Sequence, residues 1–251
     1  MPSYENYAQA ELKIWQQQML KPASLTNRLA KSLQVRINNL IPEKLHQAIT
    51  ATIKQMTRGV LFGAEFITPQ PIPADSLQGR ESIVLKRISF YKTAGAAEGG
   101  VTGAGGIFLA LADFPLLLSL KFKLLFEIAA QYGHPIDDYR ERLYILHVFQ
   151  LAFSSQERRR EVYLQMVDWD ERSKLLPNDI NEFDWRTFQQ EYRDYIDLAK
   201  MAQLIPGIGA AIGLVVNYRL LNKLGKTAMN AYRMRWVTSE KTAVIGRGKV
   251  A

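Results

Sequence analysis

The most informative segment of this 251-residue chain is Gly95-Ala-Ala-Glu-Gly-Gly-Val-Thr-Gly-Ala-Gly-Gly-Ile-Phe-Leu-Ala-Leu-Ala-Asp113-Phe-Pro115. It is dense in glycine, then strongly apolar, and it carries a carboxylate just before a proline. A shorter relative of this segment occurs near the C-terminus as Ile205-Pro-Gly-Ile-Gly-Ala-Ala-Ile-Gly-Leu-Val-Val-Asn217. Neither segment contains a recognisable catalytic motif, so both inform on fold and environment rather than on a reaction.

The glycines of both segments recur at helical spacing. Gly95, Gly99 and Gly103 are four residues apart, and Gly209 and Gly213 repeat this interval. Small residues at this spacing lie on one helical face and let two backbones approach closely, in lipid or in a tight protein core. Glycine costs about 1 kcal/mol relative to alanine inside a helix, so such helices need close neighbours. We therefore predict two central glycine-rich, small-residue helices.

The rest of the chain also has the apolar periodicity of helices, and no sustained strand alternation occurs. We predict an all-α fold that forms a single multi-helix domain. Residues 1–68 would supply amphipathic helices that pack on a core at 74–236, and 237–251 would be a basic disordered tail. Prolines between 68 and 74 break the chain, and Asp113 with Pro115 would restart it. Helices are expected at 5–20, 24–40, 42–60, from about 75 into the glycines, 115–132, 139–153, 157–167, 185–202 and about 207–235.

The net charge of +8 is concentrated towards the chain ends. Residues 204–251 carry 8 Lys/Arg against 1 Asp/Glu, whereas residues 134–203 carry 10 against 14. This division indicates contact with an anionic surface, either membrane or nucleic acid, or simply a charge that keeps the protein in solution. No helix-turn-helix signature supports nucleic acid, which we do not expect as a partner. The candidate contact residues on one face of the last helix are Arg219, Lys223, Lys226 and Arg233.

Residues 99–120 contain one formal charge, Asp113, and are long enough in principle to span a bilayer. A central aspartate costs about 2.5–3.5 kcal/mol on insertion scales, and the surrounding glycines offset little of it. Two half-length helices in a hairpin fit better, either in a protein core or in shallow contact with lipid. The N-terminus lacks the basic and apolar regions of a signal peptide, which argues against secretion.

Several polar groups fall within or beside the apolar segments, namely Asp113, Lys121, Glu127 and Asn217. Polar groups in such surroundings either satisfy structure or serve function. We hypothesise that Asp113 meets Asn217 or Arg219 where the two glycine-rich helices cross. Helix capping by Asp113, with an exposed Arg219, is the alternative.

The sequence offers little for metal binding or catalysis. It has no cysteine, and its three histidines, His46, His134 and His147, include no pair at metal-binding spacing. His134 with Asp137 and Asp138 could ligate a cation, but a turn rich in capping carboxylates explains the same residues. His147 lies on an apolar helix, as a core residue would. No nucleophile or phosphate-loop motif occurs, and we expect neither a metal nor a cofactor.

The order and spacing of four motifs resemble the EcsC family over roughly residues 35–236. These motifs are the glycine cluster at 99–106, the turn at 112–115, Glu127-Ile-Ala-Ala-Gln-Tyr132-Gly133, and the segment 206–219. The resemblance implies a bacterial-type protein whose family is named for an operon that also encodes an ABC transporter. The family has no established reaction to carry over, so no catalytic residue is transferred.

Together these features favour a non-enzymatic cytoplasmic protein that associates peripherally with the inner face of the membrane. It would bind anionic lipid or a membrane transporter through its apolar glycine-rich helices and its basic C-terminal face. One alternative is a hydrolase-type enzyme that uses Asp113, Glu127 or His134 in a cleft. Another is a soluble interaction module whose glycine helices stay in a closed core.

Overall fold

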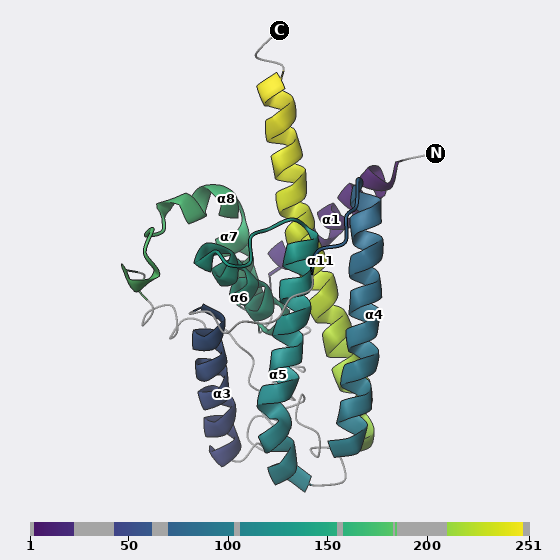
Figure 1. The fold of residues 1–251 in the computed structure, drawn as a ribbon, viewed down its shortest axis with the longest axis vertical. Coiled ribbons are helices and arrows are strands. Elements are labelled where there is room, and N and C mark those ends of the chain that lie inside the picture. The colour runs from purple at the N-terminus through teal and green to yellow at the C-terminus, as the bar shows by residue number, and fades with distance from the viewer. Residues whose placement is uncertain are drawn as a thin grey trace.

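A computed structural model describes residues 3–22, 43–61, 70–102, 106–154, 158–182, 184 and 210–247. Within helices it describes the backbone alone at 43–46, 48–49, 95–102, 106–114, 117, 210–217 and 239–247. All regular elements in the described ranges are helices (Figure 1). The prediction of an all-α fold is confirmed. The helices expected at 24–40 and 185–202 lie outside the described residues.

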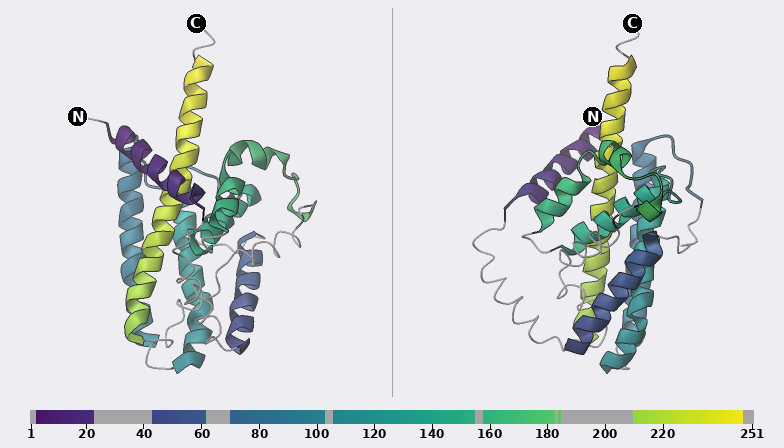
Figure 2. Two further views of the ribbon diagram at one scale, coloured as in Figure 1. Left: turned by 180° about the vertical axis from the view of Figure 1, so that it is seen from behind. Right: turned by 90° about the vertical axis from the view of Figure 1, so that its left-hand side faces the viewer.

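Three long helices form the centre of the molecule: α4 (Leu77–Thr102), α5 (Gly106–Gln131) and α11 (Ala210–Arg247). α4 runs antiparallel to α5 and to α11, and it packs against both (Figures 1 and 2). The C-terminus of α4 and the N-termini of α5 and α11 therefore lie at the same end of the bundle. Of the two glycine-rich segments, the structure describes the backbone at 95–102, 106–115 and 210–217, which is helical, and it does not describe the surroundings of their glycines.

Helix α5 continues through Pro115, so the expected restart of the chain at Asp113 and Pro115 is wrong. A proline inside a helix removes a backbone donor and crowds the preceding turn, which normally kinks or ends the helix. Here the leucines and alanines on both sides favour helix, and α4 and α11 pack along α5. Tertiary packing thus overrides the local signal.

The C-terminal end of α5 follows the sequence-based prediction. Gly133 has a φ of 88°, a left-handed conformation that favours glycine. Its N–H donates to the carbonyl of Ala130 at 2.9 Å, and the next N–H, of His134, donates to Ala129 at 3.1 Å. These bonds satisfy the last carbonyls of the helix and end it.

The remaining helices surround this centre. α6 coincides with its predicted range and is buried along most of its length, and Asp138 caps it by accepting a hydrogen bond from the N–H of Arg140 at 2.9 Å. α1 lies across α11, α4 and α7, while α3 packs on α5 and α6. The bounds are α1 Tyr4–Leu20, α3 Glu43–Leu61, α6 Tyr139–Phe153, α7 Arg159–Met166, α8 Trp169–Arg172, and the short 3-10 helices η1 Ser173–Leu175 and η2 Ile180–Glu182.

Helix α11 is longer than its sequence pattern indicates. It extends to Arg247, so the disordered tail expected from Val237 is wrong over most of its length. No proline interrupts residues 237–247, and Thr238 Oγ1 donates back to the carbonyl of Met234 at 3.0 Å. Among the described residues, none of the helices combines the length and the apolar character needed to cross a membrane.

Candidate functional site

Two arginines in α11 extend towards different neighbouring helices. Arg233 and Arg235 are two residues apart, which places them about 200° apart around the helix axis. Both are buried, with 2% and 9% of their surfaces exposed. Each meets a buried carboxylate from another helix, so they are the centres of two polar clusters.

The first cluster joins α11 to α4 and α1. Arg233 donates from Nε and Nη2 to both oxygens of Glu81 at 2.5 Å, and from Nη1 to Glu11 at 2.5 Å. Glu81 is fully buried and also accepts hydrogen bonds from the hydroxyls of Tyr4 and Tyr132 at 2.5 and 2.9 Å. Burial alone would lower the pKa of Arg233, but its bonds to the two glutamates outweigh burial and raise it. This guanidinium is therefore permanently charged.

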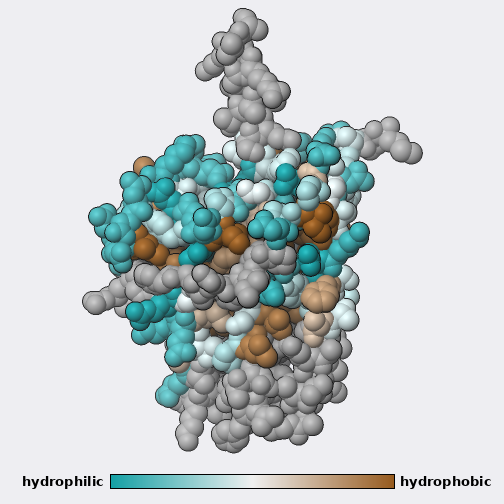
Figure 3. All heavy atoms as spheres, in the orientation of Figure 1, coloured by the Kyte–Doolittle hydropathy of each residue, from teal (hydrophilic) through white to brown (hydrophobic). Residues whose placement is uncertain are grey.

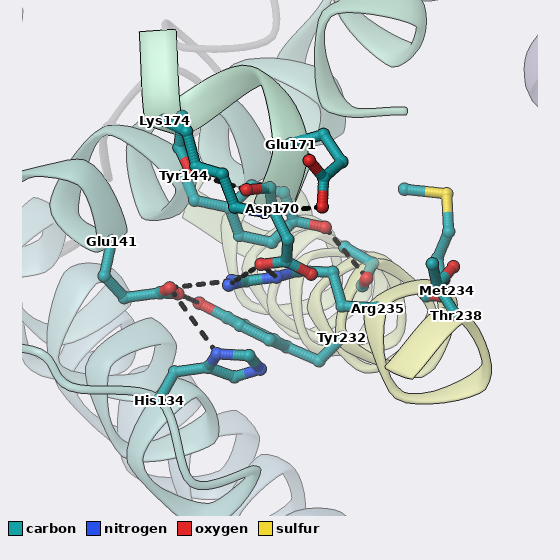
Figure 4. A network of polar contacts seen from close by, with 12 residues as sticks. His134, Glu141, Tyr144, Asp170, Glu171, Lys174, Tyr232, Met234, Arg235 and Thr238 are labelled. Carbon is teal, nitrogen blue, oxygen red and sulfur yellow. Dashed lines mark hydrogen bonds and ion pairs between the residues drawn. The ribbon is translucent and has the colours of Figure 1, made fainter. Parts of the chain in front are cut away.

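The second cluster joins α11 to α6 and α8 (Figure 4). Arg235 Nη1 donates to Glu141 at 2.7 Å, while its Nε and Nη2 donate to Asp170 at 3.0 and 2.5 Å. The hydroxyl of Tyr232 donates to Glu141 at 2.7 Å. His134 Nδ1 lies 3.6 Å from the same carboxylate, so three side chains converge on Glu141.

Burial controls the protonation of this second cluster. It raises the pKa of Glu141, although Arg235 opposes the shift. Burial, together with the nearby charge of Arg235, lowers the pKa of His134 to about 3. The imidazole is consequently neutral near pH 7, and its contact with Glu141 is not an ion pair.

Aromatic contacts connect the two clusters. The ring of Tyr232 stacks on Tyr132 with centroids 5.5 Å apart, and Tyr132 belongs to the first cluster. The guanidinium of Arg235 lies 4.6 Å from the ring centroid of Tyr144. The charged members all have protein partners, and the part of the chain that the structure describes holds no group of residues suited to a metal ion. We interpret the hydrogen bonds and ion pairs of these clusters as structural contacts that hold the helices together.

Of the four polar groups predicted at a helix crossing, the structure describes the side chains of two, Glu127 and Lys121. Glu127 is 8% exposed, accepts a hydrogen bond from Tyr91 at 2.7 Å and lies 3.5 Å from Arg87 of α4. Lys121, also on α5, is 1% exposed. The side chains of Asp113 and Asn217 lie outside the described residues, so their pairing stays a prediction.

Among the described residues, those considered for catalysis or metal binding do not contact one another. Glu127 meets α4, whereas His134 meets Glu141 of α6 and Tyr232 of α11. Asp138 caps α6. His147 is 9% exposed and its Nδ1 lies 3.3 Å from Gln150, so its prediction as a core residue is confirmed.

The predicted basic face of α11 is only partly exposed. Arg219 and Lys226 are exposed. Lys223 is half-buried and donates to the carbonyl of Ala152 at 2.7 Å, and Arg233 is buried as described above. The placement of Arg233 on an exposed contact face is wrong, because α1 and α4 cover this part of α11.

A close approach of two helices occurs at a glycine that the sequence analysis missed. A Cβ on Gly225 would lie 2.6 Å from Cγ1 of Ile88, so α11 and α4 can meet here only because that atom is absent. No second glycine stands four residues away to signal this site. The predicted close packing at Gly95, Gly99, Gly103, Gly209 and Gly213 falls outside the described side chains.

Exposed apolar side chains occur on each of the three central helices. They are Leu85 and Phe90 of α4, Leu116 of α5 and Tyr218 of α11, which are 45%, 62%, 56% and 45% exposed. Lys92 Nζ lies 4.7 Å from the Tyr218 ring centroid and donates to Asn222 at 3.2 Å. Figure 3 shows hydrophobic residues at the surface across the middle of the molecule, with mostly hydrophilic residues above them. These exposed apolar side chains and the cations beside them form the second candidate site.

Comparisons with known proteins relate most of the chain to one family. The model of the EcsC protein family matches residues 6–237. Protein EcsC of Bacillus subtilis (strain 168) is 43% identical over 222 residues, which cover 88% of this chain and 91% of that protein. The uncharacterised protein YdbA of the same organism is 26% identical over 221 residues, covering 79% and 80%. No solved structure matches the chain. The chain therefore belongs to the EcsC family.

Proposed function

We propose that this protein is a non-enzymatic cytoplasmic protein that attaches peripherally to the inner face of the membrane through the lower end of its helix bundle. One observation supports this proposal most directly. The C-terminal part of α4 and the N-terminal parts of α5 and α11 carry few charged residues. These three parts lie together at one end of the bundle, although α4 and α11 are far apart in the sequence (Figures 1 and 2).

The composition of that end suits contact with a lipid surface. Among the helical residues of that end, 93–102 and 106–120 contain two charged residues, Glu98 and Asp113, and 210–218 contain none. A carboxylate costs about 2.5–3.5 kcal/mol at the bilayer centre and less towards the interface. The two carboxylates therefore favour a shallow position over a deep one.

Cations lie on the same helices, between this end and their middle. Arg219 and Lys226 of α11 and Lys86 of α4 are exposed, and Lys92 lies beside Tyr218. Each Lys or Arg close to an anionic membrane surface contributes about 1 kcal/mol of attraction. Apolar contact and charge attraction together would exceed either alone, as stable peripheral binding requires. A membrane transporter that presents an acidic surface is the alternative target for these residues.

Vesicle flotation of the purified protein tests the proposal. We expect it to float with vesicles that contain phosphatidylglycerol, and to float less with pure phosphatidylcholine or at high salt, because salt screens the exposed cations. The variant Arg219→Glu/Lys226→Glu should lose most of this binding. The matched control Arg160→Glu/Lys174→Glu makes the same change of charge on exposed residues of α7 and η1, and should float as the wild type does.

The flotation results distinguish a specific basic surface from an effect of net charge, and a lipid target from a protein target. Equal loss in both double variants would show that net charge alone matters, and would contradict a specific basic surface. Absence of flotation under every condition would overturn direct lipid binding and leave the transporter as the target.

A further inference from the structure

A lysine of α4 and an asparagine of α11 meet at the surface where these two helices pack together. Lys92 Nζ donates to Oδ1 of Asn222 at 3.2 Å and lies 4.7 Å from the ring centroid of Tyr218. This bond uses one of the three N–H groups of the lysine. Nδ2 of Asn222, the donor end of the amide, has no acceptor among the described residues. Hydrogen-bond donors from both helices thus remain unused at one point.

Two further cations flank this asparagine on α11. Arg219 stands three residues before Asn222, and Lys226 stands four residues after it. At about 100° per residue, they lie about 60° and 40° from it around the helix axis, both to the same side. Residues at these spacings are neighbours on a helix surface. Both cations are exposed. Together with Lys92, they place three positive charges around one amide.

No carboxylate neutralises this group of cations. Neither residues 82–97 on α4 nor residues 210–239 on α11 contain an aspartate or a glutamate. Among the described residues, none forms an ion pair with Lys92, Arg219 or Lys226. Like charges at neighbouring positions repel and destabilise a helix. Cations gathered without a counter-charge favour an anionic ligand.

The donors match a phosphate group. A phosphate monoester carries a charge of about −1.5 to −2 at pH 7 and three strong acceptor oxygens. Three cations and an amide N–H suit both this charge and these oxygens, whereas a phosphodiester has a single charge. Arginine and lysine are also the side chains that proteins use most to bind phosphate.

Resting on the function proposed above, we infer that Lys92, Arg219, Asn222 and Lys226 bind the phosphate of a lipid headgroup, and that they prefer a phosphomonoester such as phosphatidic acid. The exposed ring of Tyr218 adjoins these donors. A lipid brings an apolar chain beside its phosphate, which a soluble phosphate does not. A lipid therefore suits both the cations and the neighbouring aromatic ring.

The test compares vesicles that contain phosphatidic acid with vesicles that contain phosphatidylglycerol at matched surface charge. We expect the wild type to bind the first about tenfold more strongly, which is the scale of one additional charge-assisted hydrogen bond. Lys92→Gln should abolish this preference. Lys86→Gln is the matched control, because it removes the same charge from an exposed position of α4, about 120° around the helix from Lys92. It should weaken binding to both vesicles equally and keep their ratio.

A second variant separates the site from net charge. Asn222→Leu leaves the charge of the protein unchanged but removes the amide that holds Lys92. We expect it to lower the preference for phosphatidic acid as well. Circular dichroism and thermal unfolding check that each variant keeps the fold.

Equal binding of the wild type to both vesicles would overturn this inference alone, and so would the same ratio in Lys92→Gln and Lys86→Gln. Calorimetry with glycerol 3-phosphate tests the source of the phosphate. Binding in solution that Lys92→Gln abolishes, without a preference between the vesicles, would replace the lipid by a soluble phosphate. Failure to float with either vesicle would overturn the proposed function and the lipid site with it.

Discussion

Arg233 is held between two carboxylates that belong to different helices. Replacement by methionine would keep most of its volume but leave Glu81, which is fully buried, without its cation. Removing one partner of a buried ion pair costs about 3–5 kcal/mol, because the remaining charge is desolvated and unpaired. We predict a loss of this size for Arg233→Met in urea unfolding.

Arg219→Met is the matched control, since it removes the same group from an exposed position of the same helix. Surface substitutions usually change the free energy of unfolding by less than about 0.5 kcal/mol. A loss below about 1 kcal/mol for Arg233→Met would mean that water or a rearranged neighbour compensates Glu81.

His147 should make stability depend on pH. Burial lowers its pKa to about 4, whereas an unfolded chain has a histidine pKa of about 6.5. Between these values the unfolded state binds more protons, so the free energy of unfolding falls as the pH decreases, by up to about 1.4 kcal/mol per pH unit. His134 adds a contribution of the same sign, because its pKa is also lowered.

The test compares the slope of stability against pH for the wild type and His147→Gln between pH 6.5 and 4. We expect a shallower slope in the variant, whatever its overall stability. An unchanged slope would mean that His147 is protonated in the folded state.

At the scale of elements, the contact between α4 and α11 depends on Gly225. Alanine normally stabilises a helix by about 1 kcal/mol relative to glycine. Here its Cβ would lie 2.6–3.0 Å from three carbons of Ile88, so we predict that Gly225→Ala destabilises by about 1–3 kcal/mol. Thermal unfolding of the double variant Gly225→Ala/Ile88→Ala should show less than the sum of the two single losses, because the second substitution removes the clash. If the losses of the two single variants simply added up in the double variant, the predicted clash with Ile88 would be contradicted.

The helices show which sequence signals are reliable. Caps and glycine stops act within a few residues, which explains why α6 and the end of α5 fall where Asp138 and Gly133 indicate. Pro115 is a strong local signal that the packing of α4 and α11 overrides. Gly225 gives no signal at all, because its importance depends on Ile88 of another helix.

At the scale of the whole molecule, the sequence predicts the fold class and fails at the polar clusters. The hydrogen bonds of Arg233 reach 152 and 222 residues back along the chain, to Glu81 and Glu11. Periodicity on α11 placed Arg233 with Arg219 on one face. The structure separates their environments because α1 and α4 pack against the part of α11 that holds Arg233 (Figure 2). Burial along a long helix is set by its neighbours, which no local pattern records.

The long-range ties also bear on whether the N-terminal helices form a separate domain. Backbone groups of Ile72, in the proline-rich break, exchange hydrogen bonds with the side chain of Gln131 at 3.0 and 2.7 Å. α1 contacts α11 and α4, and α3 contacts α5 and α6. The proline-rich segment is thus hydrogen-bonded to α5, and the helices before it pack on the central helices.

We therefore predict that the chain unfolds as one cooperative unit. Urea transitions followed by tryptophan fluorescence and by far-ultraviolet circular dichroism should coincide, because the emission includes Trp15 of α1 and Trp236 of α11 while the dichroism reports all helices. Arg233→Met should move both transitions together, since it cuts ties to α1 and to α4. Two separated transitions, with the variant shifting one of them, would show instead that the helices before residue 68 form a unit that detaches from the core.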